Sequence, residues 1–139
     1  MRLDYFQKVM ELEKPEMVIF AGDHSTDAID MSLVYREIPF KIVRGNTDYF
    51  DNDTKDSEIF QLGKKKFYLT HGHLFGVKRN LNELEKQAVA EGVNVCIYGH
   101  THVEYMKEKD GVLYLNPGAL QDKKYVIYNG EKFVQKKIK

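Results

Sequence analysis

Three largely apolar segments, separated by stretches of helical periodicity, predict the strands that frame this chain. Residues 17–21 are a continuous apolar run, and the other two segments cover residues 40–43 and 93–98. An apolar run without alternating polar positions is typical of a strand buried in a parallel sheet, and we expect residues 93–98 to be buried in the same way. Apolar residues at helical spacing predict helices over residues 3–13, 26–37 and 81–91. The alternation of strands with helices predicts an α/β fold.

The rest of the chain favours antiparallel pairing. The predicted hairpins join residues 57–62 to 65–70, 103–109 to 112–115, and 124–128 to 132–138. The last of them turns at Asn129-Gly130, a pair of residues that strongly favours a tight hairpin. Because no repeat, low-complexity segment or linker interrupts the pattern, we expect residues 1–139 to form one domain.

Composition narrows the classes of function. Lysine plus arginine and aspartate plus glutamate each number 21, so the formal net charge is zero. A zero balance argues against a nucleic-acid partner, which usually requires a basic excess. No membrane span and no secretion leader is evident, so we expect a cytoplasmic protein without a membrane partner. The single cysteine, Cys96, lies inside an apolar run and is interpreted as a buried hydrophobic residue.

The candidate chemistry is concentrated in four short clusters, each directly after a predicted strand. They are Gly22-Asp23, Gly45-Asn46, His71-Gly72-His73 and Gly99-His100-Thr101-His102. Imidazole, carboxylate and amide oxygen are ligands of zinc, manganese and iron. Ligands in open α/β sheets bind beyond the carboxyl ends of the strands, where such loops converge. The clusters therefore predict a metal site built from strand-end loops.

The histidines within a cluster are spaced two residues apart. In extended backbone this spacing directs both side chains to the same side of the chain. We therefore expect His71 and His73 to face one cavity, and His100 and His102 likewise.

Each cluster alone has a simpler interpretation. Gly22-Asp23 is also typical of a turn or a helix N-cap, and Gly45-Asn46 of a turn. The segment His71-Gly72-His73 is compatible with a solvated loop. Paired histidines at strand spacing rarely serve packing, and the four clusters together favour the metal site.

The ordered clusters resemble those of the calcineurin-like metallophosphoesterases, in particular the small bacterial and archaeal phosphodiesterases. The family pattern runs Asp-x-His, Gly-Asp, Gly-Asn, His-Gly-His and Gly-His-x-His. This chain matches the last four motifs and adds Asn116-Pro117-Gly118, similar to a turn of the family. The resemblance implies a sandwich of two mixed β-sheets flanked by helices.

The resemblance also implies roles for individual residues. Asp23 would bridge two metal ions, Asn46, His71 and His100 would complete the shell of one ion, and His102 would bind the other. Asp48 would orient Asn46 or a neighbouring ligand. Asn46 and His73 are the expected catalytic residues, His73 lying near the substrate. Many relatives carry a histidine where this chain has Thr47, so another group, His73 or water, would protonate the leaving group.

The implied reaction is hydrolysis of a small phosphodiester or phosphomonoester. A hydroxide held between the two divalent ions would attack phosphorus in line. Manganese, iron, zinc and nickel all suit the ligand set, and the sequence does not distinguish among these metals.

One motif of the family, Asp-x-His, is absent. In the family it closes the first strand, whereas this chain begins a helical pattern at Leu3. We therefore expect the first strand to be missing, with unpaired sheet edges and either lower stability or association into a homo-oligomer. One hypothesis is that Met1 is an internal or misassigned start and that the natural chain begins earlier.

Two functions remain as hypotheses. The retained ligands favour a metal-dependent phosphodiesterase, and the loss of Asp-x-His favours a non-catalytic scaffold or protein-interaction module of the same fold. The nearby aromatic residues Tyr49, Phe50 and Phe75 either stack on a substrate or pack in the core. His24 either reaches the site or caps the following helix.

Overall fold

The computed structural model describes residues 3–48 and 54–139, and its elements largely follow the predicted pattern. The helices are α1 (Leu3–Glu13), α2 (Ser25–Val34) and α3 (Asn82–Glu91), with short 3₁₀ turns η1 (His73–Phe75) and η2 (Leu120–Asp122). The first strands are β1 (Val18–Phe20), β2 (Phe40–Ile42), β3 (Ser57–Leu62), β4 (Lys65–Thr70) and β5 (Val95–Ile97). The last are β6 (Tyr105–Lys109), β7 (Val112–Asn116), β8 (Lys124–Tyr128) and β9 (Phe133–Lys137).

The strands divide into three groups in the part of the chain that the structure describes. A five-stranded mixed sheet has the order β3-β4-β5-β7-β6, in which β4, β5 and β7 are parallel and the two edge strands antiparallel. A parallel pair, β1-β2, and an antiparallel pair, β8-β9, form separate two-stranded sheets. The mixed α/β architecture is as predicted. The expected second mixed sheet is instead two pairs, because β1 and β8 do not hydrogen-bond to each other.

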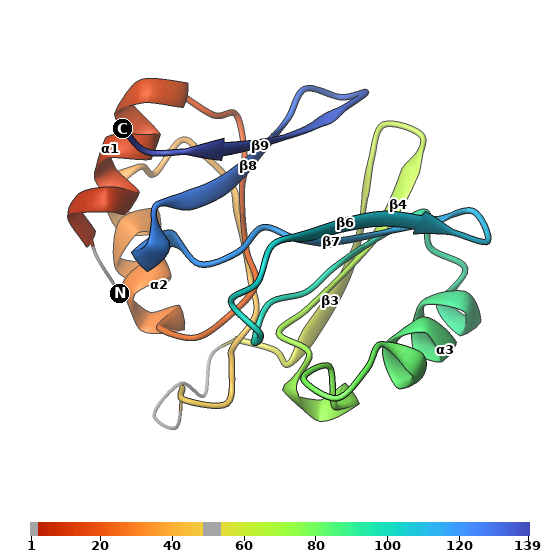
Figure 1. Cartoon of the computed structure of the whole chain (residues 1–139). Coiled ribbons are helices and arrows are strands. Elements are labelled where there is room, and N and C mark those ends of the chain that lie inside the picture. The colour runs from red at the N-terminus through yellow and green to blue at the C-terminus, as the bar shows by residue number, and fades with distance from the viewer. Residues whose placement is uncertain (1–2, 49–53) are drawn as a thin grey trace.

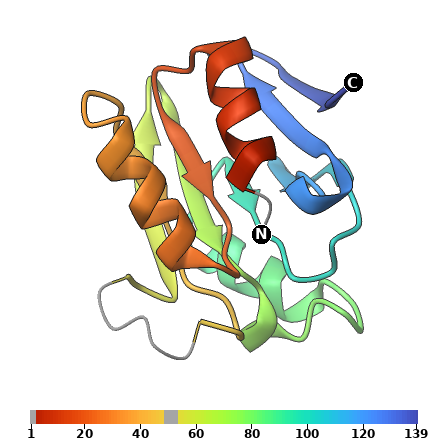
Figure 2. The same cartoon turned by 90° about the vertical axis from the view of Figure 1, so that its left-hand side faces the viewer.

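These elements pack in layers (Figures 1 and 2). Helix α3 covers one face of the five-stranded sheet, where Leu84 and Ala88 are fully buried. The opposite face packs on the two smaller sheets through a core that includes Phe67 and Leu69, with Ile19 and Val126 against it. Helices α1 and α2 lie outside the smaller sheets and share a third core cluster.

Burial corrects one prediction about these strands. Strand β5 is fully buried, as expected, but β1 is only half-buried, and β2 is half-buried as well. One edge of β1 lies beside a cavity rather than beside another strand, which exposes part of its surface. Cys96 is fully buried on β5, as predicted, and burial raises the pKa of its thiol to about 12.

Candidate metal centre

Four predicted ligands converge from loops that follow four different strands. Asp23 follows β1, Asn46 follows β2, His71 follows β4 and His100 follows β5. Three of their side chains approach the Nε2 atom of His71. Its distances are 3.1 Å to the Asn46 Oδ1 atom, 3.1 Å to the His100 Nδ1 atom and 3.4 Å to the Asp23 Oδ2 atom.

The orientation of His71 is fixed by the main chain. Its Nδ1–H donates a hydrogen bond of 2.8 Å to the carbonyl oxygen of Ala21. Burial lowers the pKa of the imidazole, so the neutral ring is favoured. A neutral ring with its hydrogen on Nδ1 presents a lone pair at Nε2. The lone pair of His71 Nε2 therefore points toward the side chains of Asn46, His100 and Asp23.

This arrangement fits a divalent cation. The lone pair of His71 Nε2 faces the Asp23 carboxylate and the Asn46 amide oxygen, which are also acceptors. Without a positive centre between them, these acceptors repel each other. Metal–ligand bonds of about 2.1 Å place neighbouring donors roughly 3.0–3.4 Å apart, close to the observed separations.

All three close approaches share a single atom, His71 Nε2. Within residues 3–48 and 54–139, no three His, Cys, Asp or Glu side chains form a metal-binding group among themselves. The cluster includes the amide oxygen of Asn46, which lies outside those four residue types. The amide oxygen therefore adds a further atom that could contact a cation at this cluster.

Asp23 is held as a carboxylate by its surroundings. Burial raises the pKa of Asp23, but hydrogen bonds from the side chain and main-chain N–H of Thr47 outweigh it, and the net pKa is lowered. The Thr47 N–H lies 3.1 Å from Asp23 Oδ1. Sequence reasoning marked Thr47 only as a departure from the family. Its contact with Asp23 became evident from the structure.

Two close backbone approaches require glycine beside this cluster. A Cβ atom on Gly45 would collide with the carboxylate of Asp23. A Cβ atom on Gly22 would lie 2.7 Å from His71 Nδ1, and Gly22 also has a φ of +97°. These glycines allow the two loops to meet at His71.

Asp48 joins the two loops that carry Asp23 and Asn46. Its Oδ1 accepts a 3.0 Å hydrogen bond from the N–H of Ser25, the first residue of α2. Its Oδ2 accepts a 2.7 Å hydrogen bond from the N–H of Gly45. The Asp48 carboxylate therefore accepts a hydrogen bond at the start of α2, where His24 was the expected capping residue. His24 itself is exposed and makes no capping hydrogen bond.

The loop that carries His100 is held by a buried amide. Asn116 donates to the Gly99 carbonyl oxygen at 3.1 Å and to the Thr101 hydroxyl at 2.9 Å. Its own Oδ1 accepts from the N–H of Gly118 at 2.9 Å. The predicted Asn116-Pro117-Gly118 turn thus braces the histidine loop. Burial, together with the nearby His71 and Lys78, lowers the pKa of His100.

The paired histidines do not have the extended backbone that we expected. His100 and His102 have φ values of 67° and 60°, and Gly72 between His71 and His73 has a φ of 101°. The strands end before these residues, so strand alternation no longer applies. His71 and His73 nevertheless lie close, with ring centroids 5.4 Å apart.

The remaining two predicted site residues occupy different positions. His102 is exposed and lines the cavity, but its ring forms no hydrogen bond with the other candidate ligands among the described residues. His73 lies 6.2 Å from His100 between ring centroids. Its Nδ1 atom is buried and has no hydrogen-bond partner in the described part of the chain. A buried polar atom without a partner is rare in folded proteins.

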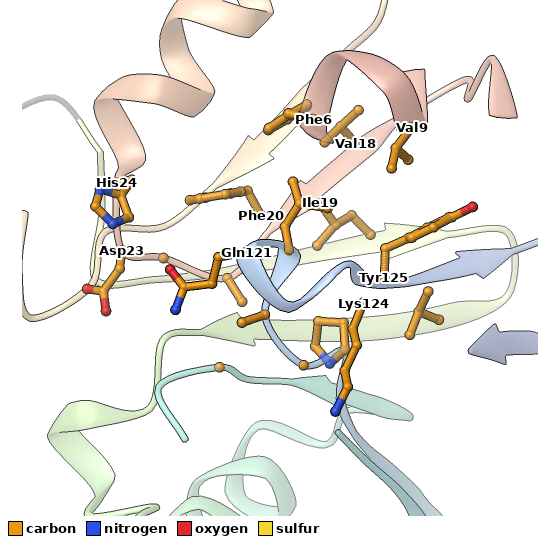
Figure 3. A pocket seen from close by; sticks show the side chains of 18 of the residues that line it. Phe6, Val9, Val18, Ile19, Phe20, Asp23, His24, Gln121, Lys124 and Tyr125 are labelled. Carbon is orange, nitrogen blue, oxygen red and sulfur yellow. The ribbon is translucent and has the colours of Figure 1, made fainter. Parts of the chain in front are cut away.

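A cavity of about 440 Å³ opens from this cluster. Asp23, His71, His100 and His102 are among the residues that line it, and Figure 3 shows Asp23 beside His24 at one side of the view. The rest extends between β1 and β8 beneath α1 and is lined largely by apolar side chains. Phe75 does not line the cavity and packs on Tyr68 in the core, while Tyr49 and Phe50 lie outside the described residues.

Comparison with known proteins identifies the family of this chain. The model of the calcineurin-like phosphoesterase superfamily domain matches residues 2–129. The chain belongs to this superfamily.

Two bacterial relatives illustrate the likeness. The chain is 32% identical over 106 residues to the probable metallophosphoesterase YsnB of Bacillus subtilis, covering 76% of this chain and 60% of that protein. It is 34% identical over 123 residues to a probable metallophosphoesterase of Mycoplasma genitalium, covering 83% and 70%. The chain thus spans well under the full length of both relatives.

Solved structures show the same fold. A predicted phosphoesterase from Streptococcus pneumoniae has a TM-score of 0.71 at 24% identity, covering 97% of this chain and 91% of that one. Vacuolar protein sorting 29 from Cryptosporidium parvum has a TM-score of 0.73 at 20% identity, covering 97% and 88%. No helix among the described residues is long and apolar enough to span a membrane.

Proposed function

We propose that this chain is a metal-dependent phosphoesterase that hydrolyses small phosphodiesters at the His71 cluster. The observation that carries the proposal is the convergence of Asp23, Asn46 and His100 on His71 Nε2 within 3.4 Å. Membership of the calcineurin-like phosphoesterase superfamily supports the same activity. The family implies divalent ions, and we infer two of them, drawn from manganese, iron, zinc and nickel.

The side chains of the cluster would hold the ions. His71 Nε2, His100 Nδ1, the Asn46 amide oxygen and the Asp23 carboxylate are the proposed ligands, with His102 reaching in from the rim. When bound, divalent ions supply Lewis acidity and lower the pKa of coordinated water. The low pKa of Asp23 and the neutral state of His71 keep both side chains ready to bind a cation at neutral pH.

His73 and Asn46 are the proposed catalytic residues. The His73 ring lies 5.4 Å and 6.2 Å from the His71 and His100 rings between centroids, and from there it would contact a phosphoryl oxygen or protonate the leaving group. Asn46 is exposed toward solvent, so its amide can contact a substrate as well as a cation. Such contacts stabilise charge that develops on the phosphoryl oxygens.

The test is hydrolysis of bis(p-nitrophenyl) phosphate with added Mn²⁺. We expect turnover by the parent chain, at least a hundredfold loss in His71→Ala, and unchanged turnover in His24→Ala. His24 is the matched control because it is an exposed histidine that makes no hydrogen bond with the cluster. A folded parent without turnover would contradict the proposal.

A second candidate is a metal-binding scaffold without catalysis. It is favoured by one observation, that Asp23 is the single carboxylate among the close donors of the cluster. A count of bound metal distinguishes the two. About two ions per chain support the enzyme, and one or none supports the scaffold.

A further inference from the structure

A buried valine fixes the segment after His73 against the candidate metal centre. The side chain of Val77 lies in the core cluster that also contains residues of α3. It packs directly on Gly72, where a Cβ atom would come within 3.0 Å of the Val77 Cγ2 atom. Because Gly72 separates His71 from His73, the position of Val77 is set relative to both histidines.

A turn and an aromatic contact hold the rest of this segment. The N–H of Arg79 donates a hydrogen bond of 3.0 Å to the carbonyl oxygen of Gly76. The Phe75 ring meets the Tyr68 ring in a T-shaped contact, with centroids 6.4 Å apart. Figure 1 shows the segment between β4 and α3 at the lower end of the molecule, where β4 ends. The main chain of Lys78 is therefore held beside the ligand loops.

Lys78 is an exposed cation whose charge reaches this centre. Burial is the largest cause of the lowered pKa of His100, and the charges of His71 and Lys78 follow. The ammonium group of Lys78 thus lies near enough to act on a proposed metal ligand. Among the described residues, its side chain forms no ion pair or hydrogen bond, whereas Lys86 and Lys109 pair with glutamates.

The carboxylates around the centre have partners other than Lys78. Asp23 and Asp48 accept hydrogen bonds from main-chain N–H groups. Asp56 pairs with Arg44, whose Nε atom lies 2.8 Å from its Oδ1 atom. An ammonium group without a counter-ion weakens cation binding nearby, because like charges repel. The position of Lys78 therefore favours a bound anion rather than the metal.

Exposure indicates which part of a substrate meets Lys78. His71 is 1% exposed, whereas Lys78 lies at the surface. A phosphodiester bound at the His71 cluster therefore leaves Lys78 on the solvent side of the scissile phosphorus. Lysine binds phosphate and carboxylate groups as a point charge with N–H donors.

We propose that Lys78 binds a second anionic group of the substrate, a phosphate or carboxylate attached beside the scissile phosphodiester. This inference rests on the proposed function and narrows its substrate class to phosphodiesters that carry an additional negative charge. The His71 cluster takes the phosphodiester, and the ammonium group of Lys78 takes the additional anion.

The experiment compares two esters that differ in one terminal group, p-nitrophenyl propyl phosphate and p-nitrophenyl 2-carboxyethyl phosphate, with Mn²⁺ present. We expect the parent chain to have a KM about fivefold lower for the carboxyethyl ester, as an exposed ion pair allows. Lys78→Gln should lose this preference, and Lys78→Arg should keep most of it because the charge remains. High salt should reduce the preference of the parent chain through screening.

The matched control is Arg79→Gln. Arg79 is an exposed cation on the same turn, but its guanidinium folds back over Gly76, with Nη2 2.9 Å from where a Cβ atom would lie. We expect this variant to keep the preference for the carboxyethyl ester. Because both variants remove one positive charge from the same turn, a difference between them reports direct contact rather than general attraction.

Binding of phosphonates separates this inference from the proposed catalysis. Propylphosphonate and 3-phosphonopropionate differ in the same terminal group, and neither is hydrolysed. In calorimetric titration with Mn²⁺ present, we expect the parent chain to bind 3-phosphonopropionate about fivefold more tightly, and Lys78→Gln to bind the two equally. This result would support the role of Lys78 even if the parent chain hydrolysed neither ester.

Three results would overturn the inference. They are equal binding of the two phosphonates by the parent chain, a preference that survives in Lys78→Gln, and an equal loss of preference in Lys78→Gln and Arg79→Gln. Absence of phosphonate binding would overturn it as well. Absence of turnover beside intact, Lys78-dependent phosphonate binding would instead contradict the proposed function.

Discussion

The imidazole of His71 donates its Nδ1 hydrogen to the main-chain carbonyl oxygen of Ala21 across 2.8 Å. Ala21 directly precedes the Gly22-Asp23 loop, so this bond links the loop after β4 to the loop after β1. It also sets which nitrogen of His71 faces the candidate metal centre. A histidine that binds a metal through one ring nitrogen is commonly oriented by a hydrogen bond that its other ring nitrogen donates.

The pKa of His71 predicts how stability changes with pH in the metal-free chain. Burial lowers the folded-state pKa below the usual 6.5, and His100 is lowered in the same direction. Between the folded-state pKa and 6.5 the unfolded chain binds more protons than the folded chain. Stability is therefore fully present above pH 6.5 and falls as the pH decreases through that window.

Thermal unfolding in EDTA at several pH values checks this expectation. We predict a lower melting temperature at pH 5.5 than at pH 7.5, and a smaller difference in His71→Gln. An equal difference in the variant would show that His71 does not control the transition.

Substitution of Gly45 tests the packing of the two ligand loops. In Gly45→Ala the new Cβ would collide with the Asp23 carboxylate, so we expect Zn²⁺ affinity to fall at least tenfold. The control is Gly130→Ala in the hairpin turn, where a Cβ meets open space but φ is +98°. That variant should lose about 1 kcal/mol of stability from backbone strain and keep its Zn²⁺ affinity. Calorimetric titration compares the two.

Substitution of Asp48 tests how much its hydrogen bonds contribute to the free energy of unfolding. In Asp48→Asn the side chain loses its charge and one of its two acceptor oxygens, while the N–H groups of Ser25 and Gly45 remain. We expect a loss of about 1–3 kcal/mol in the free energy of unfolding. Asp30→Asn, an exposed position on α2, should change the free energy of unfolding by less than about 0.5 kcal/mol. Urea unfolding of both variants decides the point.

Features that depend on local turn residues or on the order of the strands could be predicted from the sequence. The hairpins β3-β4 and β8-β9 were predicted at or within one residue of their ends, because turn residues mark both boundaries locally. The position of His71 beside Asp23, Asn46 and His100 followed from strand-end topology and the family resemblance.

Other features depend on contacts between distant segments, which no local pattern encodes. The contact of Thr47 with Asp23 and the separation of β1 from β8 arise in this way. The left-handed backbone at His100 and His102 also escaped prediction, because residues other than glycine rarely adopt it. The roles assigned to His73 and His102 remain predictions.

The central claim is that a metal ion binds at Nε2 of His71. It is tested most directly by anomalous diffraction at the zinc edge from crystals of this chain grown with Zn²⁺. We predict an anomalous peak about 2.1 Å from His71 Nε2, with His100, Asn46 or Asp23 as further ligands. A well-ordered His71 with no peak beside it, or zinc bound only elsewhere on the molecule, would contradict the account.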